Sequence, residues 1–143
     1  MSKLTLAIAE AVAEEVLKAA RASGGAPLAV AILDDGGHLK LLKRQDGTAP
    51  LRPDIAIGKA WGAVAMQVPS RTIAQVSNQN PQFVAALTTL SGGRVLPNAG
   101  GVLIRNDAGV LLGAAGVSGD TPDNDEAFAI QGIQSAGLRS DPA

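Results

Sequence analysis

The sequence predicts an α+β domain in which helices flank an antiparallel sheet of about five strands. Three observations lead to this class. Apolar residues recur at helical spacing near both ends of the chain, short apolar runs of strand length lie between them, and turn sequences join these runs in pairs. Short turns join antiparallel strands, whereas parallel strands need a long crossover. We therefore expect hairpins, with the helices on one side of the sheet.

The composition predicts one soluble domain that spans residues 1–143. The chain is 46% hydrophobic but only 2% aromatic, so its core must consist of Ala, Val, Leu and Ile. A net charge of −1 gives no reason to expect a nucleic acid or an anionic membrane as partner. The absence of cysteine excludes disulfides and thiolate metal sites. No stretch resembles a signal peptide or a membrane span, and we expect a cytoplasmic location.

The chain begins with a predicted helix, followed by a predicted hairpin. Apolar residues recur every four positions from Leu4 to Val16, which places one apolar stripe on a helix. A Ser-Gly-Gly sequence at 23–25 ends this helix. A buried strand, a turn and a more polar returning strand are expected at 28–33, 34–37 and 38–44.

The sequence of the middle of the chain predicts a loop, then three helices, then an edge strand. Val68-Pro69 ends the first of these helices, Ser70 is a candidate N-cap for the second, and Asn80-Pro81 starts the third. The following strand segment contains proline, which cannot donate a hydrogen bond to a ladder, so we expect it at an edge. The five elements are expected at 45–53, about 54–66, 70–76, from 80 onward, and 94–97.

A second hairpin and a last helix complete the chain. Two apolar runs flank the turn sequence Asn106-Asp107-Ala108-Gly109. The second run contains Gly113 and Gly116, and glycine in a strand marks the close approach of another backbone or of a ligand. Thr121 is a candidate N-cap for the helix that follows. We expect a pocket where this strand meets the helix, and a loose polar tail after Leu138.

His38 is the one histidine of the chain and follows a Gly-Gly turn. One interpretation is an exposed or backbone-bonded histidine, and the other is a metal ligand or a general base. A single histidine cannot provide a two-histidine site within one chain. Any site with several histidines must therefore combine several subunits.

Other charged residues and glycines also have two interpretations each. Arg44 and Asp46 are either a solvated strand end or a pair that holds a carboxylate and moves a proton. Lys59 either lies on the surface with its charge in water or points into a pocket. Gly100-Gly101 is either a strand contact or an anion site formed by backbone amides. The acidic residues at the start of the last helix either complement the helix dipole or bind a metal: Asp120, Asp123, Asp125 and Glu126.

The motifs of P-loop proteins, Rossmann folds, zinc hydrolases and serine hydrolases are absent. Several other segments are distinctive in their order and spacing: Asp34-Asp35-Gly36-Gly37-His38-Leu39, Arg44-Gln45-Asp46-Gly47, Ile55-Ala56, Lys59-Ala60, Gly100-Gly101-Val102, Gly113-Ala114-Ala115-Gly116-Val117-Ser118-Gly119 and Asp125-Glu126. Together they resemble the GlcG/HbpS-like family, which is named for haem binding and haem degradation and also supplies the C-terminal domain of some corrinoid adenosyltransferases. The resemblance covers about residues 4–138. Gln45 stands where the family usually has Met, and Leu103 stands where Pro commonly follows Gly-Gly-Val.

This resemblance implies a profilin-like fold and a small-molecule ligand, either haem or a related cofactor. Haem iron is held by His, Cys, Met or Tyr, which leaves His38, Met66 and Met1 as candidates in this chain. Our first hypothesis is a haem-binding protein with His38 as the metal ligand. The residues expected to contact the ligand are Arg44, Gly100, Gly101, Gly116, Ser118 and Glu126.

A second hypothesis is an enzyme that acts on a small organic acid or carbonyl compound. Family members lie in operons for glycolate and diol metabolism, so the resemblance permits this function. Arg44 and the amides of Gly100-Gly101 would hold the anion. His38, Lys59 or Asp46 would be the catalytic acid or base.

The chain is also expected to form a homo-oligomer. The runs 28–33 and 110–117 show little polar alternation, so both faces of the sheet should be covered. With helices on one face, a second subunit is the natural cover for the other, beginning with a two-fold dimer. The family resemblance implies a higher even number, such as a tetramer or octamer.

Overall fold

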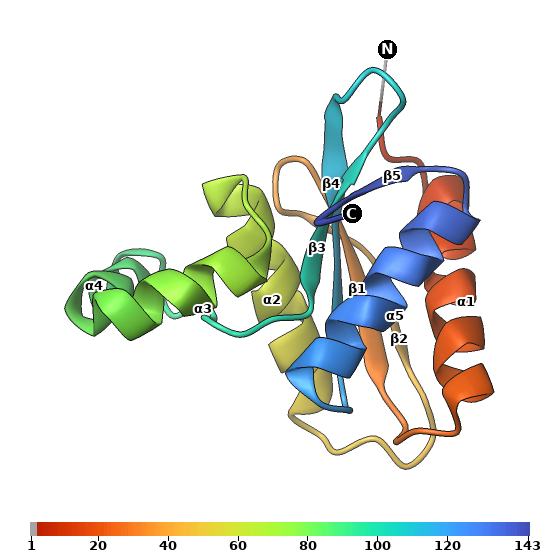
Figure 1. Cartoon of the computed structure of the whole chain (residues 1–143), viewed down its shortest axis with the longest axis horizontal. Coiled ribbons are helices and arrows are strands. Elements are labelled where there is room, and N and C mark those ends of the chain that lie inside the picture. Colours follow the sequence, from red (N-terminus) through yellow and green to blue (C-terminus); the bar gives the residue numbers. More distant parts are fainter. Residues whose placement is uncertain (1–2) are drawn as a thin grey trace.

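A computed structural model describes residues 3–143 and shows a five-stranded antiparallel sheet with helices on both sides (Figure 1). The helices are α1 (Leu6–Ser23), α2 (Arg52–Met66), α3 (Ser70–Gln79), α4 (Pro81–Leu90) and α5 (Pro122–Ser135). The strands are β1 (Ala29–Asp34), β2 (Leu39–Arg44), β3 (Gly101–Arg105), β4 (Leu111–Ser118) and β5 (Arg139–Asp141). The strand order is β2-β1-β4-β3-β5. The predicted α+β class is confirmed.

Threonine side chains begin the first and last helices. Thr5 Oγ1 accepts a hydrogen bond from the Ile8 amide at 3.1 Å, and Thr121 Oγ1 accepts one from the Asn124 amide at 3.2 Å. Each bond satisfies an amide that has no partner within its helix. The predicted cap at Thr121 is confirmed. The predicted end of the first helix is also confirmed, since Gly24 caps α1 in the left-handed conformation.

Both predicted hairpins form, and their turns have the same construction. The Gly37 amide donates to the Asp34 carbonyl at 3.0 Å, and the Gly109 amide donates to the Asn106 carbonyl at 2.9 Å. Gly37 and Gly109 each have φ of 80°, which glycine adopts without strain. The strand register shifts next to each turn, as expected for a hairpin closed by a glycine bulge.

The chain's own helices bury both faces of the central strands, which corrects the prediction of helices on one side. On β1, Val30 and Ile32 pack with α1 and α5, whereas Ala31 and Leu33 pack with α2. Side chains alternate between the faces of a strand, so a run without polar residues must be covered on both. Because α2 provides the second cover, the central strands give no reason to expect a partner subunit, whereas Leu39 and Leu42 of the edge strand β2 remain exposed.

Glycine allows α2 to lie directly on the sheet. A Cβ at Gly116 would lie 1.9 Å from the carbonyl oxygen of Ala56, and a Cβ at Gly101 would lie 2.2 Å from that of Lys59. Gly101 and Gly116 are paired on β3 and β4. Of the two interpretations of glycine in these strands, the structure supports the close approach of another backbone.

Residues 94–97 do not form the predicted edge strand. Val95 instead packs with Ile73 and Val84 of the neighbouring helices. Its carbonyl accepts a hydrogen bond from Thr88 Oγ1 at 3.2 Å. A side chain therefore satisfies a backbone group that would otherwise join a sheet ladder.

The C-terminal tail and the start of α3 also differ from the prediction. Residues 139–141 form β5 beside β3 instead of a loose tail. At this edge, Arg105 of β3 lies 3.6 Å from the carboxylate of Asp141. Ser70 is the first residue of α3 and not its N-cap, because its hydroxyl accepts a hydrogen bond from the Gly101 amide at 2.7 Å.

The helices α3 and α4 form an arm that extends away from the sheet (Figure 1). The arm comprises residues 70–90. A small apolar cluster attaches it to the rest of the molecule, with Trp61 of α2 packed against Ile73, Val84 and Val95. Within α4, Val84 is buried and Leu90 is 85% exposed. The arm therefore presents apolar side chains to solvent.

Replacing Gly116 with Ala should destabilise the fold by about 3 kcal/mol or more, because the new methyl group would overlap the backbone of α2. Urea denaturation followed by circular dichroism measures this change. Gly58→Ala is the matched control, since a Cβ there would meet Leu96 Cβ at 3.3 Å and alanine favours the helix. Its stability should stay within about 1 kcal/mol of wild type. Equal stability of Gly116→Ala and wild type would contradict the close seating of α2.

Candidate functional site

His38 lies at the end of the β1–β2 turn, where the carboxylate of Asp34 holds its ring. Asp34 Oδ1 accepts hydrogen bonds from the Gly36 amide at 3.0 Å and from the His38 amide at 2.9 Å. The same oxygen lies 3.3 Å from His38 Nδ1. The His38 side chain is 81% exposed. Since Asp34 engages Nδ1, Nε2 is the nitrogen that remains for a ligand.

The turn itself maintains this arrangement. Partial burial raises the pKa of Asp34, but the hydrogen bonds from the His38 and Gly36 amides outweigh it and hold the pKa below its usual value of 3.8. The carboxylate is therefore ionised at neutral pH. The His38 ring lies over Gly36, where a Cβ would be 2.9 Å from Nδ1. Histidines that bind metals usually donate their second ring N–H to a carboxylate or carbonyl, and a carboxylate oxygen lies 3.3 Å from Nδ1 in the Asp34–His38 pair.

An aromatic ring adjoins the same turn, and a cation lies over that ring. A Cβ at Gly37 would lie 3.0 Å from Trp61 Nε1, so the indole of α2 packs against the turn. The Arg94 guanidinium lies 4.0 Å from the centre of the Trp61 ring, which is a cation–π contact. We refer to Asp34, His38, Trp61 and Arg94 together as the turn site.

Lys59 lies in the core, which rules out the interpretation of a surface lysine. Its side chain is 1% exposed, and its Nζ lies 3.1 Å from Asp125 Oδ2, whose side chain is also 1% exposed. Nζ also donates to the Val117 carbonyl at 2.9 Å. Burial lowers the pKa of Lys59 and raises the pKa of Asp125, while the attraction between the two charges opposes both shifts. The pair ties α2 to β4 and α5.

Two arginines contact other residues near this pair. Arg52 Nη1 donates to Ser118 Oγ at 3.3 Å. Arg71 Nε lies 3.0 Å from both carboxylate oxygens of Glu126, and Arg71 Nη2 pairs with Asp123. Glu126 therefore holds α5 against α3, and Ser118 holds the end of β4 against α2. Both residues, expected to contact a ligand, have protein partners here.

The three candidate glycines lie beneath α2 around the buried lysine. The Gly101 amide donates to Ser70 Oγ at 2.7 Å, and the Gly100 carbonyl accepts from the Val117 amide at 3.0 Å. A Cβ at Gly100 would lie 2.8 Å from Lys59 Nζ. In this position, Gly100, Gly101 and Gly116 permit close packing.

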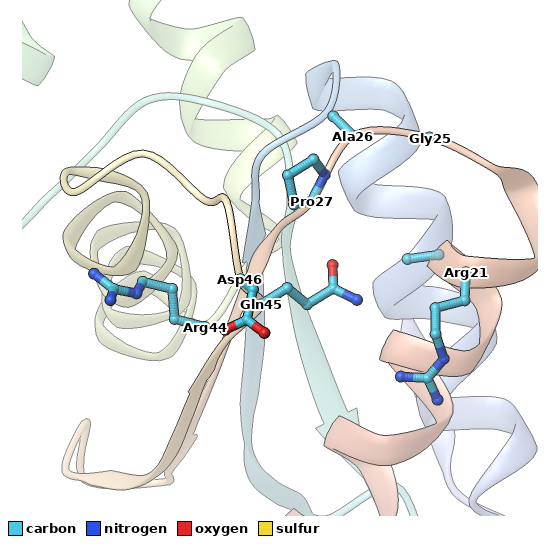
Figure 2. Close-up of a pocket in the computed structure, with 8 residues that line it drawn as sticks. Arg21, Gly25, Ala26, Pro27, Arg44, Gln45 and Asp46 are labelled. Atoms are coloured by element: carbon cyan, nitrogen blue, oxygen red, sulfur yellow. The ribbon is translucent and has the colours of Figure 1, made fainter.

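A hollow of about 580 Å³ lies between the end of α1 and the end of β2 (Figure 2). Gln45 and Asp46 lie on one side of it, and Arg21 of α1 lies on the other. Figure 2 shows the Arg44 side chain extending away from Arg21. Gly100-Gly101 does not line this hollow, so the structure does not bring Arg44 and that glycine pair to one anion site.

Gln45 links the end of β2 to the start of β1. Its Oε1 accepts a hydrogen bond from the Leu28 amide at 2.9 Å. The backbone N–H of Gln45 in turn donates to the Leu28 carbonyl at 3.0 Å. The side chain thus extends the pairing of β1 and β2 by one residue.

An apolar groove of about 180 Å³ lies where the end of α2 meets the arm. It contains Met66, whose side chain is partly exposed and which is a second candidate iron ligand. Met1, the third candidate, lies outside the described residues. The residues lining the groove are Met66, Val68, Thr72, Ile73, Val76, Phe83, Val84 and Leu87.

Within residues 3–143, no group of three or more histidine and acidic side chains is arranged to hold a metal ion. The acidic residues at the start of α5 are instead engaged with arginine, lysine and backbone amides. No helix in the same range has both the length and the apolar character needed to cross a membrane.

The partners of the candidate residues are not evident from the sequence. Lys59 does carry a signal, because it falls at helical spacing between Ala56 and Ala63 on the buried face of α2. A lysine at such a position requires a buried counter-charge. Nothing in the local sequence identifies Arg71 as the partner of Glu126, because the two are 55 residues apart.

Comparison with known proteins gives the family. Residues 4–134 match the family model described as "Haem degrading protein HbpS-like". The chain belongs to the HbpS-like family. The resemblance to that family is thereby confirmed.

Relatives of this HbpS-like chain match it along most of their length. An uncharacterized 15.0 kDa protein from the dhaT-dhaS intergenic region of Citrobacter freundii is 27% identical over 129 residues, which are 90% of this chain and 89% of the relative. A double mutant of HbpS from Streptomyces reticuli is 29% identical, with a TM-score of 0.80 over 94% of this chain and 88% of that one. PduOC, solved as a haem complex, is 24% identical, with a TM-score of 0.87 over 98% and 99% of the two chains. This last similarity is one of fold.

Removing the buried lysine should destabilise the protein in a pH-dependent manner. In Lys59→Met, Asp125 remains in the core without its counter-charge, and we expect a loss of about 3–5 kcal/mol at neutral pH. Burial already raises the pKa of Asp125 above 3.8, and removal of Lys59 raises it further. The folded state then binds a proton more tightly than the unfolded state, so stability falls as pH rises from about 3.8 through the raised pKa. Urea denaturation between about pH 4 and pH 8 measures this trend.

The double variant Lys59→Met/Asp125→Asn is the control. Asparagine keeps an acceptor for the Asp120 amide, which Asp125 Oδ1 binds at 2.9 Å, but carries no charge at any pH. The double variant should recover part of the stability that Lys59→Met loses, and its stability should not show the added pH dependence of Lys59→Met. If Lys59→Met were as stable as wild type at every pH, the ion pair would not stabilise this core.

Proposed function

We propose that this protein binds haem, or a closely related metal tetrapyrrole, through His38 of the turn site. The observation that carries the proposal is the Asp34–His38 pair, in which a carboxylate orients an exposed imidazole. Membership of a family described as haem degrading supports the choice of ligand. Histidine is also a common axial ligand of haem iron.

The residues of the turn site fit the parts of such a ligand. Asp34 Oδ1 lies 3.3 Å from His38 Nδ1, and Nε2 would be the iron ligand. Trp61 packs against the turn and carries the Arg94 guanidinium over its ring, and that guanidinium would pair with a propionate group. Bound haem would supply redox and oxygen chemistry that amino-acid side chains lack.

We also propose that the protein functions as a homo-oligomer: a dimer, tetramer or octamer. A single His38 provides one axial ligand, and a neighbouring copy is a source for another. The exposure of His38 supports this arrangement, because a ligand held on an open turn is otherwise covered on one side alone.

The alternative function, an enzyme for a small organic acid or carbonyl compound, has less support. Its two anion-holding groups lie apart, with Arg44 beside the hollow and Gly100-Gly101 beneath α2. Its candidate base Lys59 is already engaged with Asp125.

Titration with haemin, followed at the Soret band, tests the haem proposal. We expect His38→Ala to weaken binding by about tenfold or more, and Asp34→Asn to weaken it by about tenfold, because outer partners of a metal ligand contribute on that scale. Lys40→Ala is the matched control, since Lys40 is an exposed residue of β2, two positions after His38. Its affinity should equal that of wild type.

Three outcomes would contradict parts of this assignment. Unchanged affinity in His38→Ala would exclude His38 as the ligand. Loss of haemin binding in Met66→Leu, together with unchanged haemin binding in His38→Ala, would indicate that Met66 in the groove beside the arm is the iron ligand. No spectral change in the wild-type protein would exclude haem binding altogether.

A further inference from the structure

We infer that the arm, residues 70–90, carries the surface through which a second copy of this chain docks. The inference rests on the self-association proposed above and specifies where it occurs. The central strands of the sheet are not available for this purpose, because helices of the same chain cover both of their faces.

The arm presents a groove and protruding apolar side chains next to each other. The groove of about 180 Å³ lies between the end of α2 and the two arm helices. Met66 and Phe83 at its rim are 41% and 47% exposed, and Leu90 on the same helix as Phe83 is 85% exposed. Leu87 also lines the groove, and Phe83, Leu87 and Leu90 are spaced to share one face of α4. Exposed apolar side chains gathered on one face mark an interaction site in soluble proteins.

The groove is of a size for side chains rather than for a free ligand. Pockets for small molecules and cofactors usually measure about 300–1,000 Å³, and this groove is well below that range. Its lining is apolar apart from Thr72. Large aliphatic or aromatic side chains therefore suit it, and the arm itself supplies both kinds in Phe83 and Leu90.

The charge pattern favours a second copy over a different protein. Between Arg71 and Arg94 the chain contains no Asp, Glu, Lys or Arg, although 17% of all residues are charged. A two-fold axis brings each residue near its own counterpart, so any charge on such a surface would meet the same charge. A surface without charges avoids this repulsion, and it offers no salt bridge by which a foreign partner would be selected.

The groove and the protruding side chains lie on the same arm, as a two-fold contact requires. In such a contact, the protruding residues of each copy enter the groove of the other, and the same patch serves twice. The arm is held in place for this by the Trp61 cluster and by the Arg71–Glu126 ion pair. A surface that is already ordered loses little conformational entropy on binding.

Light scattering coupled to size exclusion, over a range of concentrations, tests the inference. We expect the wild-type protein to elute at a multiple of 14.4 kDa. Leu90→Lys and Phe83→Lys should each shift the mass toward 14.4 kDa and raise the dissociation constant of the arm contact by about tenfold or more. Circular dichroism and thermal unfolding establish that each variant is folded, and Leu90, which is 85% exposed, should tolerate lysine without loss of stability.

Leu51→Lys is the matched control. Leu51 is 63% exposed and precedes α2, at the opposite end of that helix from the arm. The mass of the Leu51→Lys variant in solution should equal that of the wild-type protein. A wild-type mass of 14.4 kDa at every concentration would overturn both the proposed self-association and this surface, and would leave the groove to another occupant such as an amphipathic helix. A wild-type oligomer that persists unchanged in folded Leu90→Lys and Phe83→Lys would overturn the surface alone.

Discussion

The close seating of α2 on the sheet is the constraint on which the rest of this structure depends. Gly101 and Gly116 leave no side chain between the strands and the helix backbone. At this separation Lys59 reaches the Val117 carbonyl and the carboxylate of Asp125. A helix held further away would strand that charge in the core, at a cost of several kcal/mol. The glycines and the ion pair are therefore parts of one arrangement.

On the opposite face of the sheet, a glycine again allows two elements to pack closely. A Cβ at Gly132 of α5 would lie 2.3 Å from Val16 Cγ2 of α1, so these helices also pack closely. A core with so few aromatic residues achieves its density through backbone proximity rather than through large side chains. Substitutions that add volume at these contacts therefore displace whole elements.

Local features of the fold could be predicted because local chemistry determines them. Thr121 caps a helix and Gly109 closes a hairpin through bonds to residues a few positions away. The absence of polar alternation in β1 correctly predicts two buried faces, but nothing in that run says whether a helix or another subunit covers each. Residues 94–97 have strand-like composition, and their partners are set by helices that pack beside them.

The contacts of the candidate residues could be predicted less well, because several of them join distant parts of the chain. Lys59 and Asp125 are 66 residues apart, and neither residue's neighbours indicate the other. The Asp34–His38 pair spans one turn and lies within a segment that the sequence singles out. Its geometry nevertheless depends on hydrogen bonds to a single carboxylate oxygen, and composition does not reveal which side chain a turn will orient.

Trp61 is the one tryptophan of the chain, which contains no tyrosine. Its ring lies between the turn that carries His38 and the cluster that anchors the arm. The near-ultraviolet emission of this protein therefore originates at a single ring that touches both regions. The intrinsic fluorescence of Trp61 therefore reports on both regions without an attached label. It should respond to a chromophore that binds at the turn and to a change in the position of the arm.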